Sequence, residues 1–123
     1  MSARGLAVEK PKMVDGPTVR DAVMSLLRDL RMTTLFGNPG STELPLFRDM
    51  PQDFQYILGL QESVVVGMAD GYAQMSGNAA FVNLHSSAGT GHALGNIFTA
   101  FRNQTPLVIT AGERQLRLEL TEP

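Results

Sequence analysis

The stretch that decides the fold is AFVNLHSSAGTGHALGNIFTAFRN, residues 80–103. Its first five residues, 80–84, are mostly apolar and bounded by turn-forming residues, which predicts a short buried strand. Apolar residues recur at helical spacing over 91–103, so we expect a helix there. The small residues between the two, which follow His85, predict a turn. A buried strand followed by a turn and a helix is the repeating unit of a parallel sheet.

The same alternation runs through the rest of the chain. Strands are expected at residues 33–36, 55–60 and 107–111, and helices at 18–30, 42–47 and 62–75. Strand and helix alternate throughout, and two of the strands are nearly all apolar, which together indicate a parallel sheet with helices on both faces. The predicted fold class is therefore α/β.

Two helix starts can be predicted from capping residues. Thr18 followed by Asp21 resembles a capping box, and Ser41 or Thr42 is suited to cap the short helix that Pro51 ends. The apolar stripe expected on the first helix comprises Val19, Ala22, Val23, Leu26, Leu27 and Leu30.

The composition excludes several classes of protein. The chain has 123 residues, of which 43% are hydrophobic and 18% charged, as in a globular domain. A formal net charge of −2 gives no electrostatic reason to expect nucleic acid or an anionic membrane as a partner. No apolar stretch approaches the roughly 20 residues of a membrane span. Cysteine is absent, which excludes thiolate metal sites and fits a cytoplasmic location.

The chain divides into a leader and one domain. Residues 1–16 contain only the short apolar run 6–8, too short for the core of a signal peptide, and we expect a flexible leader. Residues 17–123 are expected to form the domain. Because residues 116–123 resemble the start of another element, the domain is expected to be incomplete at its C-terminus.

Glu62 and His85 are the first candidates for chemistry. Each follows a predicted strand, at the edge where parallel sheets bind ligands. An acid and an imidazole at one edge are a candidate pair for proton transfer. A purely structural role stays open for both residues. The helix dipole alone favours a glutamate in the first turn of a helix, where Glu62 is expected. A hydrogen bond to a neighbouring loop would account for a histidine at position 85. His92 is expected in the first turn of the following helix, at the surface or supporting the site.

Three glycine-containing segments allow further interpretations. Residues 37–43 are expected to form a turn and the start of a helix. Their amides and hydroxyls could also bind the carboxylate of a ligand. Residues 89–95 resemble a dinucleotide loop, but the third glycine comes one place too late. Gly67 and Gly71 lie one turn apart in an apolar helix, which indicates close packing on the sheet or against another subunit. No metal site is predicted, since the two histidines lack zinc-site spacing.

Three motifs carry a family resemblance: FGNPGS at 36–41, LQE at 60–62 with GMADGYA at 67–73, and NLHS at 83–86. Together they resemble the N-terminal, pyrimidine-binding domain of thiamine-diphosphate-dependent 2-oxo acid decarboxylases, a family of carboxy-lyases. The segment 83–86 is most similar to that of benzoylformate decarboxylases.

The resemblance implies a role for each matching residue. Glu62 would hydrogen-bond the pyrimidine nitrogen of thiamine diphosphate, which promotes loss of the proton from the thiazolium carbon. His85 would relay protons or orient the 2-oxo acid substrate, and Ser41 would hydrogen-bond the substrate's carboxylate. The implied pocket residues are Asn38, Pro39 and Gly40.

The resemblance also implies that half of the site lies elsewhere. The family binds the diphosphate and Mg²⁺ through a Gly-Asp-Gly motif of a C-terminal domain, and this motif does not occur in the sequence. Family sites form between subunits of a dimer or tetramer, so the chain alone is expected to be inactive. The alternative is a noncatalytic or split-enzyme module that pairs with a separate diphosphate-binding chain.

Overall fold

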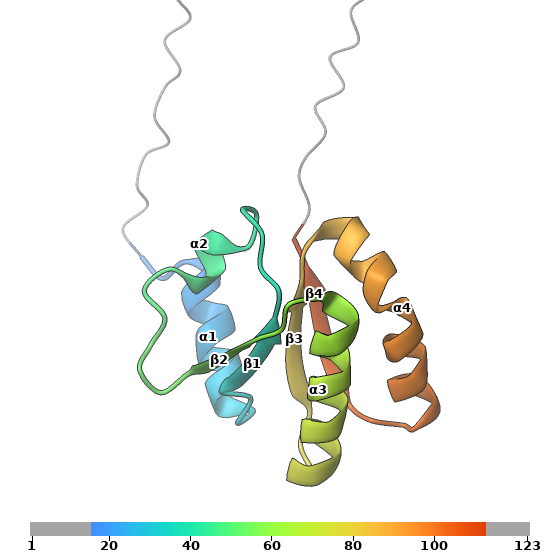
Figure 1. The fold of residues 1–123 in the computed structure, drawn as a ribbon. Helices are drawn as coiled ribbons and strands as arrows, with labels where there is room; N and C mark the ends of the chain where they lie inside the picture. The colour runs from blue at the N-terminus through green and yellow to red at the C-terminus, as the bar shows by residue number, and fades with distance from the viewer. Residues whose placement is uncertain (1–15, 113–123) are drawn as a thin grey trace, which may run out of the picture.

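The computed structural model describes residues 16–112, and the expectations for the leader and for the C-terminal end lie outside this range. Four parallel strands form one sheet in the order β2-β1-β3-β4 (Figure 1). The strands are β1 (Thr34–Gly37), β2 (Gln55–Leu58), β3 (Ala80–Leu84) and β4 (Leu107–Ala111). The predicted α/β class with a parallel sheet is confirmed.

Helices cover both faces of the sheet, as expected. One face carries α1 (Val19–Asp29) with the short α2 (Leu44–Phe47), and the other carries α3 (Glu62–Ser76) and α4 (Ser86–Arg102) (Figure 1). Neighbouring residues of a strand point to opposite faces. On β1, Leu35 therefore joins the core beneath α1, whereas Phe36 joins the core beneath α3 and α4.

Burial of β3, one of the two interior strands, stabilises the sheet. All five residues of β3 are buried, because β3 has a strand on each side and helices on both faces. The sequence predicts the bounds of β3 and β4 correctly. Strand β2 ends at Leu58, two residues earlier than expected, and Leu60 beyond it is exposed.

The first helix begins as predicted but buries a different stripe. The Thr18 amide donates to Asp21 Oδ2 at 2.9 Å, and the Asp21 amide donates to the Thr18 hydroxyl at 3.2 Å, which completes the capping box. Met24 and Leu27 are the buried residues of the helix. The expected stripe is wrong in part, because its members Val19, Leu26 and Leu30 are exposed.

The start predicted for the second helix is wrong. Glu43 occupies the N-cap of α2, and no side chain makes a capping hydrogen bond there. The helix is held instead by Arg20 of α1, whose guanidinium donates to the carbonyl of Leu46 at 3.0 Å. Neither Ser41 nor Thr42 therefore caps α2.

Helix α4 begins at Ser86, five residues before the predicted start. His85 is its N-cap residue, and the amide of Gly89 donates to the carbonyl of His85 at 2.8 Å. The segment 89–95 is helical, which removes the loop that the dinucleotide interpretation required. His92 consequently lies in the second turn rather than the first.

Candidate functional site

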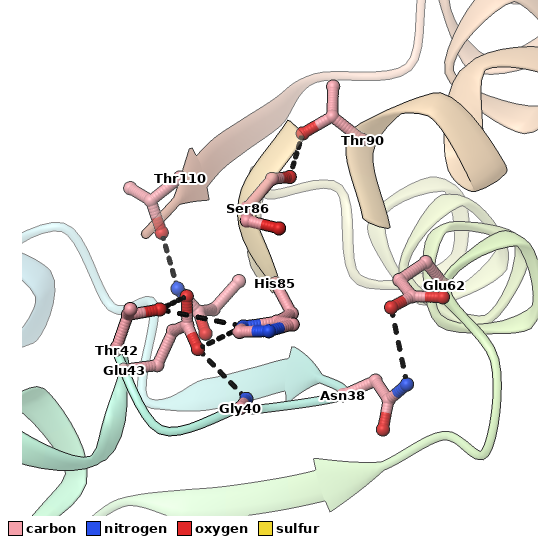
Figure 2. A network of polar contacts seen from close by, with 10 residues as sticks. Asn38, Gly40, Thr42, Glu43, Glu62, His85, Ser86, Thr90 and Thr110 are labelled. Atoms are coloured by element: carbon pink, nitrogen blue, oxygen red, sulfur yellow. Dashed lines mark hydrogen bonds and ion pairs between the residues drawn. The ribbon is translucent and has the colours of Figure 1, made fainter. Parts of the chain in front are cut away.

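The carboxyl edge of the sheet brings the candidate residues together. Asn38 follows β1, Glu62 begins the helix after β2, and His85 follows β3. Because β1 lies between β2 and β3, these three residues project from adjacent strand ends (Figure 2). Local folding therefore places all three at the edge where parallel sheets bind ligands.

Glu62 is buried without being the helix cap. Its residue is 7% exposed, although it is the first residue of α3. The capping role is filled by Gln61, whose side chain accepts from the amide of Val64 at 3.2 Å. Glu62 Oε1 accepts from Asn38 Nδ2 at 3.3 Å, and Oε2 lies 3.4 Å from His92 Nδ1. Both contacts are long, so the carboxylate keeps capacity for a further partner.

The backbone of α4 packs directly on the Glu62 side chain. A Cβ atom at Gly89 would lie 2.9 Å from Glu62 Oε1 and 3.0 Å from its Cγ. A glycine at this position lets the first turn of α4 approach the carboxylate and cover it. The same approach brings His92, one turn later, within reach of Glu62.

His85 is paired with a second buried acid, Glu43. Nδ1 of His85 lies 2.9 Å from Glu43 Oε2, which also accepts from the Gly40 amide at 2.8 Å. The other carboxylate oxygen, Oε1, accepts from the Thr42 hydroxyl at 2.5 Å (Figure 2). Burial raises the pKa of Glu43, but the hydrogen bonds from Thr42, His85 and Gly40 outweigh it and hold that pKa below its ordinary value.

Glu43 is the functional candidate that the sequence did not reveal. The turn 37–43 was expected to offer free amides to a carboxylate, and the Gly40 amide does bind one. The carboxylate is the chain's own Glu43, which is only 3% exposed. The signal in the sequence was an acidic residue two positions before Pro45 at the end of a turn, which by itself fits a surface residue equally well.

The loop after β1 contacts both halves of the site. Asn38 reaches Glu62, and Gly40 lies against the ring of His85, where a Cβ atom would fall 2.6 Å from Nε2. Asn38, Pro39 and Gly40 are half-buried, whereas Ser41 is exposed. Among residues 16–112, no hydrogen bond joins Glu62 to His85, so the two candidates share an edge but have different hydrogen-bonding partners.

Comparison with known proteins shows which family has this fold and sequence. Residues 17–122 match the model of the family "Thiamine pyrophosphate enzyme, N-terminal TPP binding domain". The chain belongs to this family. The FGNPGS, LQE and NLHS motifs of the TPP-binding domain lie at the strand ends that carry Asn38, Glu62 and His85.

Within this family, the chain is similar to benzoylformate decarboxylases and, at lower identity, to acetolactate synthases. The TPP-binding domain is 57% identical over 97 residues to benzoylformate decarboxylase of Pseudomonas aeruginosa, which covers 79% of this chain and 18% of that protein. An acetolactate synthase large subunit of Haemophilus influenzae is 33% identical over 95 residues, covering 76% and 17%. The crystal structure of benzoylformate decarboxylase from Polynucleobacter necessarius superposes with a TM-score of 0.80 at 47% identity, covering 88% and 20%.

These relatives are much longer than the chain, which spans about a fifth of their length. Within residues 16–112, no helix is long and apolar enough to cross a membrane. The same part of the TPP-binding domain contains no group of three or more histidine, cysteine, aspartate or glutamate side chains arranged to hold a metal ion.

Proposed function

We propose that this TPP-binding domain supplies the pyrimidine side of the active site of a non-oxidative 2-oxo acid decarboxylase of the benzoylformate decarboxylase type. The observation that carries the proposal is the buried carboxylate of Glu62, which lies at the ligand-binding edge of the sheet and is not used as a helix cap. The 57% identity to a benzoylformate decarboxylase supports this reaction over acetolactate synthesis, for which two relatives are 35% and 33% identical.

The geometry around Glu62 fits an aminopyrimidine ring. An ionised carboxylate can accept about four hydrogen bonds, and Glu62 makes two long ones. Its remaining capacity suits a ring nitrogen that shares a proton with the carboxylate. When bound, thiamine diphosphate supplies the nucleophilic carbon and the electron sink for decarboxylation. Glu62 holds or releases the proton at Oε1 or Oε2 and so controls the protonation of the pyrimidine.

His85 and Ser41 act on the substrate side. The His85 side chain is 40% exposed, so its ring is accessible from the edge while Nδ1 is held by Glu43. His85 therefore transfers protons at Nε2 or orients the 2-oxo acid. The exposed hydroxyl of Ser41, on the loop that passes the ring, donates to the substrate's carboxylate. Pro39 and Gly40 line the pocket between them.

The diphosphate and Mg²⁺ are held by a second domain, either in another subunit of a homo-oligomer or on a separate chain. This part of the proposal is supported by an apolar face on α3 and α4 that points away from the sheet. On α3, Val64, Gly67, Gly71 and Met75 recur at helical spacing and are all exposed. The exposed apolar residues of α4 are Leu94, Phe98 and Phe101. A face of this kind marks a protein contact.

Calorimetry and product assays test the proposal. The 123-residue chain alone should bind thiamine diphosphate with Mg²⁺ weakly and should not convert benzoylformate to benzaldehyde and carbon dioxide. Assembled with a diphosphate-binding domain of the benzoylformate decarboxylase type, it should do both. Tight binding and turnover by the chain alone would contradict the half-site. An assembled enzyme that binds the cofactor but decarboxylates neither aromatic nor aliphatic 2-oxo acids would contradict the reaction.

A further inference from the structure

We propose that Glu43 is a positioning residue that fixes the tautomer of His85, with the proton on Nδ1 and the free lone pair on Nε2. The inference rests on the proposed function for one point, that His85 acts on the substrate. The contact itself is independent of that function: His85 Nδ1 lies 2.9 Å from Glu43 Oε2.

The Glu43 carboxylate is enclosed by four residues from three separate parts of the chain. The Gly40 amide and the Thr42 hydroxyl donate to it from the loop after β1, and His85 contacts it from the end of β3. Gly112, beyond β4, closes the fourth side, because a Cβ atom there would overlap Glu43 Oε1. A carboxylate fixed in this way can hold the orientation of the ring that it contacts.

Support of helix α2 does not explain this arrangement. Glu43 is the N-cap residue of α2, where a side chain ordinarily accepts from an amide of the first turn. Its side chain makes no such bond. Both of its oxygens are directed instead at the loop and at His85. The free-energy cost of burying the Glu43 carboxylate is therefore offset by its hydrogen bonds to the loop after β1 and to His85, which organise the candidate site.

The hydrogen-bonding partners of Nδ1 determine the tautomer. The lowered pKa of Glu43 keeps this carboxylate ionised at neutral pH, so it can only accept. The Thr42 hydroxyl lies 3.5 Å from Nδ1, but its hydrogen is directed at Glu43 Oε1, 2.5 Å away. Both neighbours of Nδ1 are acceptors, and the ring nitrogen between them must carry a proton.

The consequence is a histidine whose Nδ1 donates to Glu43 and whose Nε2 has a free lone pair. In the neutral ring, Nε2 has the lone pair and can take up a proton, while the negative charge of Glu43 stabilises the imidazolium that forms. Gly40 restricts the ring from the side, since a Cβ atom there would lie 2.6 Å from Nε2. Glu43 touches the ring and not the substrate, so its effect on turnover is exerted through His85.

Nitrogen NMR of the full chain, with ¹⁵N-labelled histidine, tests the tautomer directly. The chain has only His85 and His92, so the His92→Gln variant assigns the signals. At neutral pH, His85 should carry its proton on Nδ1. In Glu43→Gln, whose amide can donate to Nδ1, the population should shift toward the Nε2-protonated form. A wild-type His85 protonated mainly on Nε2 would overturn the proposal, and this result does not depend on the folding of Glu43→Gln.

Kinetics of the assembled enzyme provide the second test. Glu43→Gln should lower kcat for benzoylformate by about 10- to 100-fold, by analogy with the loss seen when a carboxylate that orients a metal-ligating histidine is removed. The affinity for thiamine diphosphate should change little. In the background of His85→Ala, Glu43→Gln should have almost no further effect. Effects that multiply would overturn the positioning role. If the wild-type assembly is inactive, the proposed function fails, while the NMR measurement still decides the role of Glu43.

Discussion

Gly40 lies directly against the imidazole of His85, so closely that a Cβ atom at position 40 would fall 2.6 Å from Nε2. Two residues earlier in the same loop, Asn38 donates to Glu62. The loop after β1 therefore contacts the residues that follow both neighbouring strands. Its conformation determines how the two halves of the candidate site are placed.

Substituting Gly40 by alanine should displace the His85 ring. The added methyl group overlaps the imidazole, and overpacking of this kind costs about 1–3 kcal/mol in the free energy of unfolding. Turnover of the assembled enzyme should fall, because the ring leaves the position that Glu43 and the loop define. Denaturant unfolding and benzaldehyde formation are the measurements. Gly16→Ala is the control, since a Cβ atom there meets nothing within 4 Å. Equal behaviour of the two variants would show that the ring is not confined.

Two glycines of α4 should respond in opposite ways to alanine. Gly89→Ala places a methyl group 2.9 Å from Glu62 Oε1 and should destabilise the chain or push the carboxylate out. Gly95→Ala meets nothing within 4 Å, and replacing a glycine in an exposed helix interior should stabilise the chain by up to about 1 kcal/mol. Thermal unfolding of both variants checks the difference. A stabilised Gly89→Ala variant would mean that α4 does not cover Glu62.

Acid should remove the stability that Glu43 contributes. The folded-state pKa of Glu43 is lowered, so its contribution is present above the unfolded value of about 4.3 and is lost as the pH falls through the folded value. The difference in unfolding free energy between wild type and Glu43→Gln should therefore shrink below about pH 4.3. Urea unfolding at a series of pH values measures it. A difference that does not depend on pH would contradict an ionised, hydrogen-bonded Glu43.

Replacing His85 by alanine should affect turnover more than cofactor affinity. The ring lies beside the loop 38–41, and among residues 16–112 its recorded hydrogen-bond partners are Glu43 and Thr42 rather than Glu62, so the pyrimidine side of the site should remain intact. Loss of a group that transfers protons typically costs about 100-fold or more in kcat. Steady-state kinetics and calorimetry with thiamine diphosphate separate the two effects. A variant with weakened cofactor binding and unchanged kcat would assign His85 a different role.

The fold could be predicted from the sequence because strands and helices alternate and two of the short strands are nearly all apolar. The run 80–84 has no polar residue except Asn83 and became the central strand β3 with the predicted bounds. The buried stripe of α1 was harder to predict. Apolar side chains occur on several sides of that helix. Only packing against the sheet determines that Met24 and Leu27 are buried and that Leu26 is exposed.

The missed features depend on contacts between residues far apart in the chain. Small residues at 86–90 are typical of a turn, but they are helical here, where Gly89 fits against the Glu62 side chain of another helix. The pairing of Glu43 with His85 joins residues 42 positions apart. Local patterns in a sequence do not report such a contact.

The most direct test of the central claim is the rate of benzaldehyde formation by the assembled enzyme when Glu62 is replaced by glutamine. The substitution preserves shape but removes the ability to exchange a proton with the pyrimidine, so the rate should fall about 100-fold or more while the chain remains folded. Asp29→Asn is the matched control, because Asp29 is exposed at the end of α1 and α1 leads into the opposite edge of the sheet. An unchanged rate in Glu62→Gln would contradict the claim that this buried carboxylate acts on thiamine diphosphate.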